Sequence, residues 1–157
     1  MNLTSVGKRI ERVDAVDKVT GQALFGDDLS FPNALYGKAL RSPYAHAKII
    51  HIDVSKAEKL PGVKAVVTGQ ELDALGGEAL KDYRFLAKDK VRYVGEPVAA
   101  VAAKSIEIAE NAVDLIQVEY EQLPLVLDPI EAMQKQAPLV HEDLGSYEHL
   151  ALSLIHI

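Results

Sequence analysis

The sequence predicts a domain of the α/β (α+β) class, in which helices pack on a mixed β-sheet and an extended N-terminal arm precedes the domain. Segments rich in β-branched apolar residues alternate with short helical segments along the middle of the chain. One longer segment has apolar residues at helical spacing. The 157 residues are 48% hydrophobic and 25% charged, as in a globular protein of about one domain. Because helices bury their apolar faces on a sheet, we expect one layered domain.

The expected elements follow in chain order. Residues 1–31 are rich in charge, Gly and Asp and predict the arm, and Pro32-Asn33 predicts a turn. We expect strands at residues 35–41, 47–54, 63–68, 91–94, 98–103 and 117–123. We expect helices at residues 55–60, 70–75, 105–115 and 130–135. The polar stretch from Lys81 to Lys90 predicts an exposed loop.

Two of these elements have the clearest patterns. In the helix at 105–115, Ile106, Ala109, Val113 and Ile116 recur at offsets of three and four and predict one buried face. The strand at 98–103 is almost wholly apolar, which indicates a strand covered on both faces. The domain boundaries we expect are therefore an arm at 1–31, a domain at 32–137 and the start of a linker at 138–157.

Composition excludes several classes of partner and site. The net charge is −6 and basic residues do not cluster, so we expect no nucleic-acid partner. The absence of cysteine excludes disulfides, thiolate zinc sites and iron–sulfur ligation within this chain. Since no stretch approaches the roughly 18–20 apolar residues of a membrane span, and the N-terminus does not resemble a signal peptide, we expect no membrane partner and a cytoplasmic location.

Two pairs of residues are candidate ligands for a metal ion. His46 and His51 are separated by an odd offset, which places them on opposite faces of a regular strand, so we interpret both as structural. Asp27-Asp28 offers adjacent carboxylates for a divalent cation. The alternative is a turn in which these oxygens accept local backbone N–H bonds.

Glu119 and Glu121 share a strand face, about 7 Å apart. Paired carboxylates can perform acid–base chemistry, but the alternation with Val118 and Tyr120 favours a solvated face. The sequence contains neither of the glycine-rich nucleotide-binding patterns nor a His-Glu-x-x-His zinc motif.

Gly95-Glu96-Pro97 lies between the strands expected at 91–94 and 98–103. Glycine allows close backbone approach and proline cannot donate to a sheet ladder, so this tripeptide indicates a bend or bulge where another segment packs closely. The alternative interpretation is a sharp connection between strands. From the residues alone, the chain is an α/β domain without a visible active site.

Several ordered segments together resemble the entry to the molybdenum-binding subunit of xanthine dehydrogenases and aldehyde oxidases. The fourth of them contains that family's Arg-Ser-x-x-Ala-His-Ala-x-Ile pattern, and the resemblance runs from about Val6 to about His149. The segments are Arg12–Ala15, Lys18–Gly21, Asp27-Asp28, Leu40–Ile49, Ile52-Asp53 with Ala57, Pro61–Val63, Ala87–Ala99 and Val118–Pro124.

The resemblance implies the a/b hammerhead domain and a complex enzyme. Such enzymes hydroxylate a carbon next to nitrogen or oxygen, in aldehydes or N-heteroaromatic compounds, with water as the oxygen source. The molybdenum is held by molybdopterin, and electrons leave through two [2Fe–2S] clusters, usually to FAD, often on separate iron–sulfur and FAD subunits. The implied partners are the rest of the molybdopterin-binding subunit and those two subunits.

The family's pterin-contacting Gly-Gly-Gly-Phe-Gly-Gly loop and late catalytic glutamate do not occur in this sequence. The resemblance therefore assigns no catalytic, cofactor-binding or metal-binding residue here. By position, the residues expected to contact the rest of the subunit or its partners are Arg41, Ser42, His46, Gly95, Glu96 and Pro97.

Residues 151–157 resemble translated adaptor sequence, so we expect a truncated gene product whose last residues are artefactual. The main functional hypothesis is a non-catalytic scaffold domain of a molybdenum hydroxylase. A free-standing α/β binding module and a small hydrolase that uses Glu119 and Glu121 are the alternatives.

Overall fold

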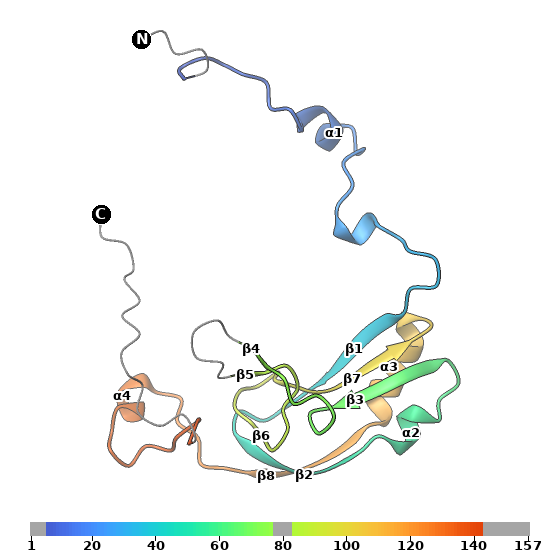
Figure 1. Ribbon diagram of the computed structural model, residues 1–157. Helices are drawn as coiled ribbons and strands as arrows, with labels where there is room; N and C mark the ends of the chain where they lie inside the picture. Colours follow the sequence, from blue (N-terminus) through green and yellow to red (C-terminus); the bar gives the residue numbers. More distant parts are fainter. Residues whose placement is uncertain (1–5, 77–82, 143–157) are drawn as a thin grey trace. The chain divides into compact units, whose positions relative to one another are not determined.

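The computed structural model describes residues 6–76 and 83–142. The chain divides into two compact units, Met1–Ala34 and Leu35–Ile157 (Figure 1). The expected linker from residue 143 onward, including the tail at 151–157, lies outside the described residues.

The N-terminal unit contains two helical turns, α1 (Ala15–Val19) and a 3-10 helix at Gly26–Asp28. Neither buries a residue, although the sequence predicted only an extended arm. The Asp14 carboxylate accepts hydrogen bonds from the Lys18 ammonium and the Arg12 guanidinium, and these bonds hold the pKa of Asp14 below its ordinary value. The Asp28 carboxylate accepts the Phe25 N–H at 2.9 Å, which confirms the local-turn interpretation for Asp28.

The second unit holds the strands in small antiparallel sheets. In the first, β1 (Tyr36–Arg41) and β3 (Val63–Thr68) flank β7 (Pro97–Ala103). In the second, β6 (Lys90–Val91) and β8 (Gln117–Gln122) flank β2 (Ala47–Asp53). A two-stranded pair joins β4 (Leu75–Gly76) to β5 (Tyr83–Arg84).

The predicted α+β class is confirmed, but a single mixed sheet was the wrong arrangement for the described strands. Every pairing among them is antiparallel, and the strands divide among three sheets. Strand periodicity shows which residues share a face. It does not show which distant strands pair or in which direction, and β1 pairs with β7, a strand far along the chain.

The helices of this unit are α2 (Ser55–Glu58), α3 (Ile106–Leu115) and α4 (Pro129–Ala132). The Ser105 hydroxyl caps α3 by accepting the Ile108 N–H at 3.3 Å. As Figure 1 shows, α3 packs against β1 and β7. Its buried positions are Ala109 and Ala112, whereas the predicted Ile106 is 42% exposed.

Three local predictions were wrong. The strand expected at 91–94 is the short strand β6, which ends at Val91. The expected helix at 70–75 is a single turn followed by β4, because the Glu71 carboxylate accepts the Thr68 N–H at 2.7 Å and closes the turn. The expected exposed loop at 81–90 is partly structured where it is described. Leu86, Ala87 and Lys90 are buried there, and the Lys90 ammonium reaches Glu142 at 2.9 Å. A lysine can bury its methylene groups while its ammonium group pairs with a carboxylate, so a polar composition does not reveal that such a residue is buried.

The core of this unit consists mainly of alanine and valine. One buried cluster lies between the first sheet, α2 and α3, and includes Ala99, Val101 and Ala103 of β7. A second cluster joins Val98 to Ala47, Ala87 and Val91. Such short side chains allow α3 to approach the sheet closely.

Candidate functional site

A β-bulge lies where the end of β1 pairs with the start of β7. Leu40 pairs with Ala99, but Arg41 pairs with Pro97, so Val98 has no residue opposite it on β1. The bulge brings the Arg41-Ser42 end of β1 beside the Gly95–Pro97 start of β7.

Main-chain hydrogen bonds hold the two segments together. The Ser42 N–H donates to the Glu96 carbonyl at 2.9 Å, and the Gly95 N–H donates to the Ser42 carbonyl at 2.8 Å. The Arg41 guanidinium donates to the Gly95 carbonyl at 2.8 Å. Gly95 has φ +89°, a conformation that L side chains rarely adopt. Five of the residues singled out by sequence therefore form one cluster that is both a bulge and a sharp connection.

Glu96 is the buried centre of this cluster, with 2% of its surface exposed. Its carboxylate accepts the backbone N–H of Arg92 and so closes the loop that leads into β7. Desolvation raises the pKa of Glu96 above its ordinary value, and the hydrogen bond from Arg92 offsets part of that effect. The carboxylate faces its own loop, so its role in the described chain is to hold that loop.

His46 lies beside the same loop. It is 7% exposed, and Nδ1 lies 2.7 Å from the Pro124 carbonyl. The Leu123 N–H donates to the His46 carbonyl at 3.0 Å, so the histidine joins β2 to the segment after β8. His51 is exposed on β2, where its partner in the antiparallel pairing is Glu119 on β8. Their separate environments agree with two structural histidines, although a register shift between Ile49 and His51 breaks the regular alternation that we assumed.

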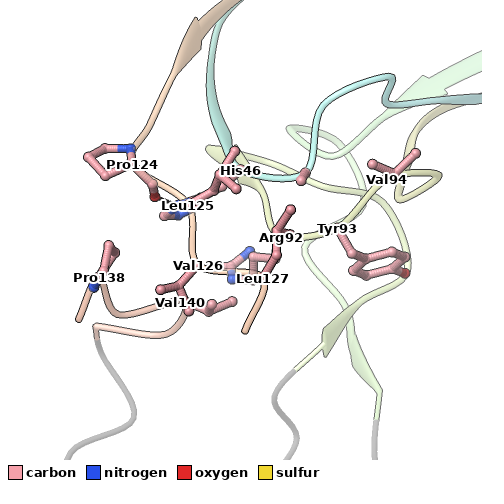
Figure 2. A pocket seen from close by; sticks show the side chains of 11 residues that line it. His46, Arg92, Tyr93, Val94, Pro124, Leu125, Val126, Leu127, Pro138 and Val140 are labelled. Atoms are coloured by element: carbon pink, nitrogen blue, oxygen red, sulfur yellow. Dashed lines mark hydrogen bonds between the residues drawn. The ribbon is translucent and has the colours of Figure 1, made fainter. Parts of the chain in front are cut away.

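His46 also lines a pocket with a volume of about 230 Å³ (Figure 2). Its other walls come from the loop before Gly95 and from the segment after β8. The lining residues are Ala45, His46, Arg92, Tyr93, Val94, Pro124, Leu125, Val126, Leu127, Pro138 and Val140. This pocket was not predicted from the sequence, in which Pro124 simply follows the strand expected at 117–123. The apolar run Leu123–Leu127, in a region rich in charge, was the available signal.

The first sheet presents an open face of small residues. Ala39, Ala100 and Val67 are cross-strand neighbours, as are Gly37, Ala102 and Ala65. These positions alternate with the residues that contact α3, so they lie on the face away from that helix. All six are half-buried or exposed, and a hollow of about 550 Å³ extends over part of this face. We call these six residues the open face. The prediction that β7 is covered on both sides is therefore wrong for Ala100 and Ala102 in the described chain.

Glu119 and Glu121 are both exposed on β8, and Glu121 lies 3.7 Å from the Lys48 ammonium across β2. The solvated-face interpretation of this pair is confirmed. Within residues 6–76 and 83–142, no three His, Cys, Asp or Glu side chains gather into a group that could hold a metal ion. In the same ranges, no helix has the length and apolar character needed to cross a bilayer.

The family model for the a/b hammerhead domain of aldehyde oxidase and xanthine dehydrogenase matches residues 20–124. The chain belongs to this family. The hammerhead chain is similar to a probable xanthine dehydrogenase component of Bacillus subtilis, with 48% identity over 89% of this chain and 19% of the relative. It is 38% identical to the carbon monoxide dehydrogenase large chain of Afipia carboxidovorans, over 90% of this chain and 18% of the relative.

The crystal structure of a Cu,Mo-CO dehydrogenase is similar to the hammerhead chain, with a TM-score of 0.83 and 38% identity. The match covers 89% of this chain and 18% of that structure's chain. The hammerhead chain thus spans about a fifth of the length of the relatives it matches.

The family implies a molybdopterin cofactor, but the described residues do not fit it. The pocket at His46 is smaller than the roughly 300–1,000 Å³ of ordinary cofactor sites and is mostly apolar. The hollow over the open face offers only Lys38 and Arg41 as charged groups. We therefore assign no cofactor step to residues of this chain.

Proposed function

We propose that this hammerhead domain is the N-terminal scaffold of a molybdenum hydroxylase large subunit and docks on the remainder of that subunit. In this proposal, residues 32–137 form the scaffold and residues 138–157 begin the linker. The observation that carries the proposal is the open face, an apolar sheet surface without a covering layer in the described chain.

Small side chains make the open face suitable for close packing. Sheets stack about 10 Å apart when the residues between them interdigitate. Val67 is the largest of the six residues of the open face, so a second layer can approach these positions closely, while the longer Lys38 and Arg41 line the hollow beside them. Burial of such a surface is favourable because apolar area leaves water, and extended apolar patches mark interaction sites.

The whole enzyme, in this proposal, hydroxylates an aldehyde or an N-heteroaromatic compound with oxygen from water. Molybdopterin is held by the remainder of the subunit, and the [2Fe–2S] clusters and FAD are on partner domains or subunits in the cytoplasm. The described residues contribute shape and contact surface and perform no step of the reaction.

A grafted subunit tests the proposal. The matched region of the Bacillus subtilis relative is replaced by this chain, and the molybdenum content of the purified subunit is measured. We expect a soluble subunit whose molybdenum content is close to that of the parent. A soluble graft without molybdenum, or a graft that aggregates while the parent assembles, would contradict the proposal and favour a free-standing module.

Two charge substitutions in the grafted subunit, one on the open face and one away from it, provide a matched comparison. Ala100→Glu places a carboxylate where the remainder of the subunit would pack, and we expect it to abolish molybdenum incorporation in the graft. Glu107→Lys changes a charge on the exposed side of α3 and is expected to leave incorporation unchanged.

A further inference from the structure

The chain returns to the second sheet after α4. Pro138 and Val140 line the pocket that Figure 2 shows, whose other walls include the segment after β8. Close behind them, the Glu142 carboxylate lies 2.9 Å from the Lys90 ammonium of β6. We call residues 138–142 the return segment. It contains the first residues of the expected linker, so its contacts decide where the linker leaves the sheet.

The two partners of this ion pair differ in burial. The Lys90 side chain is 9% exposed, whereas that of Glu142 is 60% exposed. Within residues 6–76 and 83–142, Glu142 is the one group that accepts a hydrogen bond from this ammonium. Ion pairs between two exposed side chains contribute little, but a charge on a buried side chain is costly without a counter-charge. Lys90 therefore needs the carboxylate that the return segment supplies.

The pairing of β2 with β6 increases this need. Lys48 and Lys90 lie directly opposite each other in the antiparallel register, and like charges in that position repel each other. Lys48 has a carboxylate of its own, because Glu121 of β8 lies 3.7 Å from its ammonium. Each lysine thus has a separate counter-charge, and the one for Lys90 comes from Glu142.

Two further basic side chains act on the Glu142 carboxylate. The hydrogen bond and the charge of Lys90 lower the pKa of Glu142 most, and the charges of His46 and Arg92 lower it further. Glu96, which follows Arg92 in the chain, accepts a hydrogen bond in its own loop and does not pair with Lys90. Basic groups from two separate segments therefore surround a single carboxylate of the return segment.

We propose that the ion pair between Lys90 and Glu142 anchors the return segment on the second sheet. The start of the linker is then a fixed part of the hammerhead unit and not a flexible tether. In the whole subunit, where this inference rests on the proposed function, the anchor fixes the point from which the remainder leaves the hammerhead. A fixed point of departure raises the effective concentration of the remainder at the open face.

The distance between two nitroxide labels tests the anchor on the full chain. Because the chain has no cysteine, Leu139→Cys and Glu107→Cys place one label on the return segment and one on the exposed side of α3. Leu139 is 64% exposed and does not line the pocket. Double electron–electron resonance measures the distribution of the distance between the labels, and we expect a narrow distribution.

Glu142→Lys replaces the attraction at the anchor by a repulsion between two ammonium groups. We expect this substitution to broaden the distance distribution by about 12 Å, the root-mean-square span of about five freed residues. Glu131→Lys makes the same change of charge on the exposed surface of α4, in the segment that leads to the return segment, and should leave the distribution narrow.

A second pair of labels reports on the hammerhead itself. Gln70→Cys and Glu107→Cys lie on exposed positions after β3 and on α3. Their distance distribution should be equally narrow with and without Glu142→Lys, because the anchor holds only the return segment.

The inference is overturned if the first distribution is already broad before the charge is changed, or if Glu142→Lys leaves it narrow. It is also overturned if Glu131→Lys broadens it equally, or if the second pair of labels broadens together with the first. None of these results bears on the molybdenum content of the grafted subunit, which decides the proposed function separately.

Discussion

Gly95→Ala tests whether the bulge between β1 and β7 depends on backbone conformation. Gly95 has φ +89°, and a Cβ built there meets no atom within 4 Å, so strain in the backbone is the expected cost. Left-handed conformations cost an L residue about 1–2 kcal/mol. We expect the variant to lose that much free energy of unfolding. A loss of this size lowers Tm by about 3–10 °C for a unit of this length.

Gly37→Ala is the matched control. A Cβ at Gly37 also meets no atom within 4 Å, but Gly37 does not have a positive φ. Substitution at a compatible glycine stabilises by about 0.4–1 kcal/mol because it restricts the unfolded chain. Urea unfolding of the full chain, followed by far-UV circular dichroism, measures both variants. The explanation fails if Gly95→Ala is as stable as Gly37→Ala.

The remaining predictions concern the loop, a close backbone contact, the α3 cap and a surface ion pair. Burial raises the pKa of Glu96 above 4.5. The contribution of this group to stability is therefore present below about pH 4.5 and declines as the pH rises through the folded pKa. Glu96→Gln should remove this decline, and equal pH profiles of the two proteins in urea unfolding would refute the prediction. In Gly69→Ala the new Cβ would lie 2.3 Å from the Ala87 carbonyl oxygen, so we expect a loss of about 1–3 kcal/mol in the same assay, and a neutral effect would show that the contact relaxes freely. Ser105→Ala should cost about 1 kcal/mol through loss of the α3 cap, whereas Ser105→Asp, which retains a capping oxygen, should not. Lys38→Ala breaks the exposed pair with Glu110 and should cost less than about 1 kcal/mol in thermal unfolding; a larger loss that persists in high salt would contradict an electrostatic origin.

The parts of the fold that sequence predicted are those with regular patterns. The strand at Val63–Thr68 was expected from its apolar β-branched residues, and the long helix from its apolar residues at helical spacing. The predicted ranges agree with β3 and α3 to within a residue. The helix expected at 70–75 failed because one side chain, Glu71, bonds to the Thr68 backbone instead of leaving that N–H for a regular element. Helix propensity does not account for a side chain that competes in this way for a backbone N–H.

The cluster of Arg41, Ser42 and Gly95–Pro97 was suggested by motif position, and the structure brings these residues together through the bulge. Their role in contacts with the rest of the large subunit remains a prediction. The pocket was missed because its walls come from three separate segments around His46, which lie together only after folding.

Burial of the open face is the central claim, and a single thiol at Ala100→Cys tests it most directly. Its rate of maleimide modification is compared between this chain and the subunit into which the chain is grafted, with peptide mass spectrometry to locate the label. We predict modification about tenfold slower or more in the grafted subunit. Equal rates in the two proteins would show that the open face stays exposed to solvent and would contradict the scaffold role.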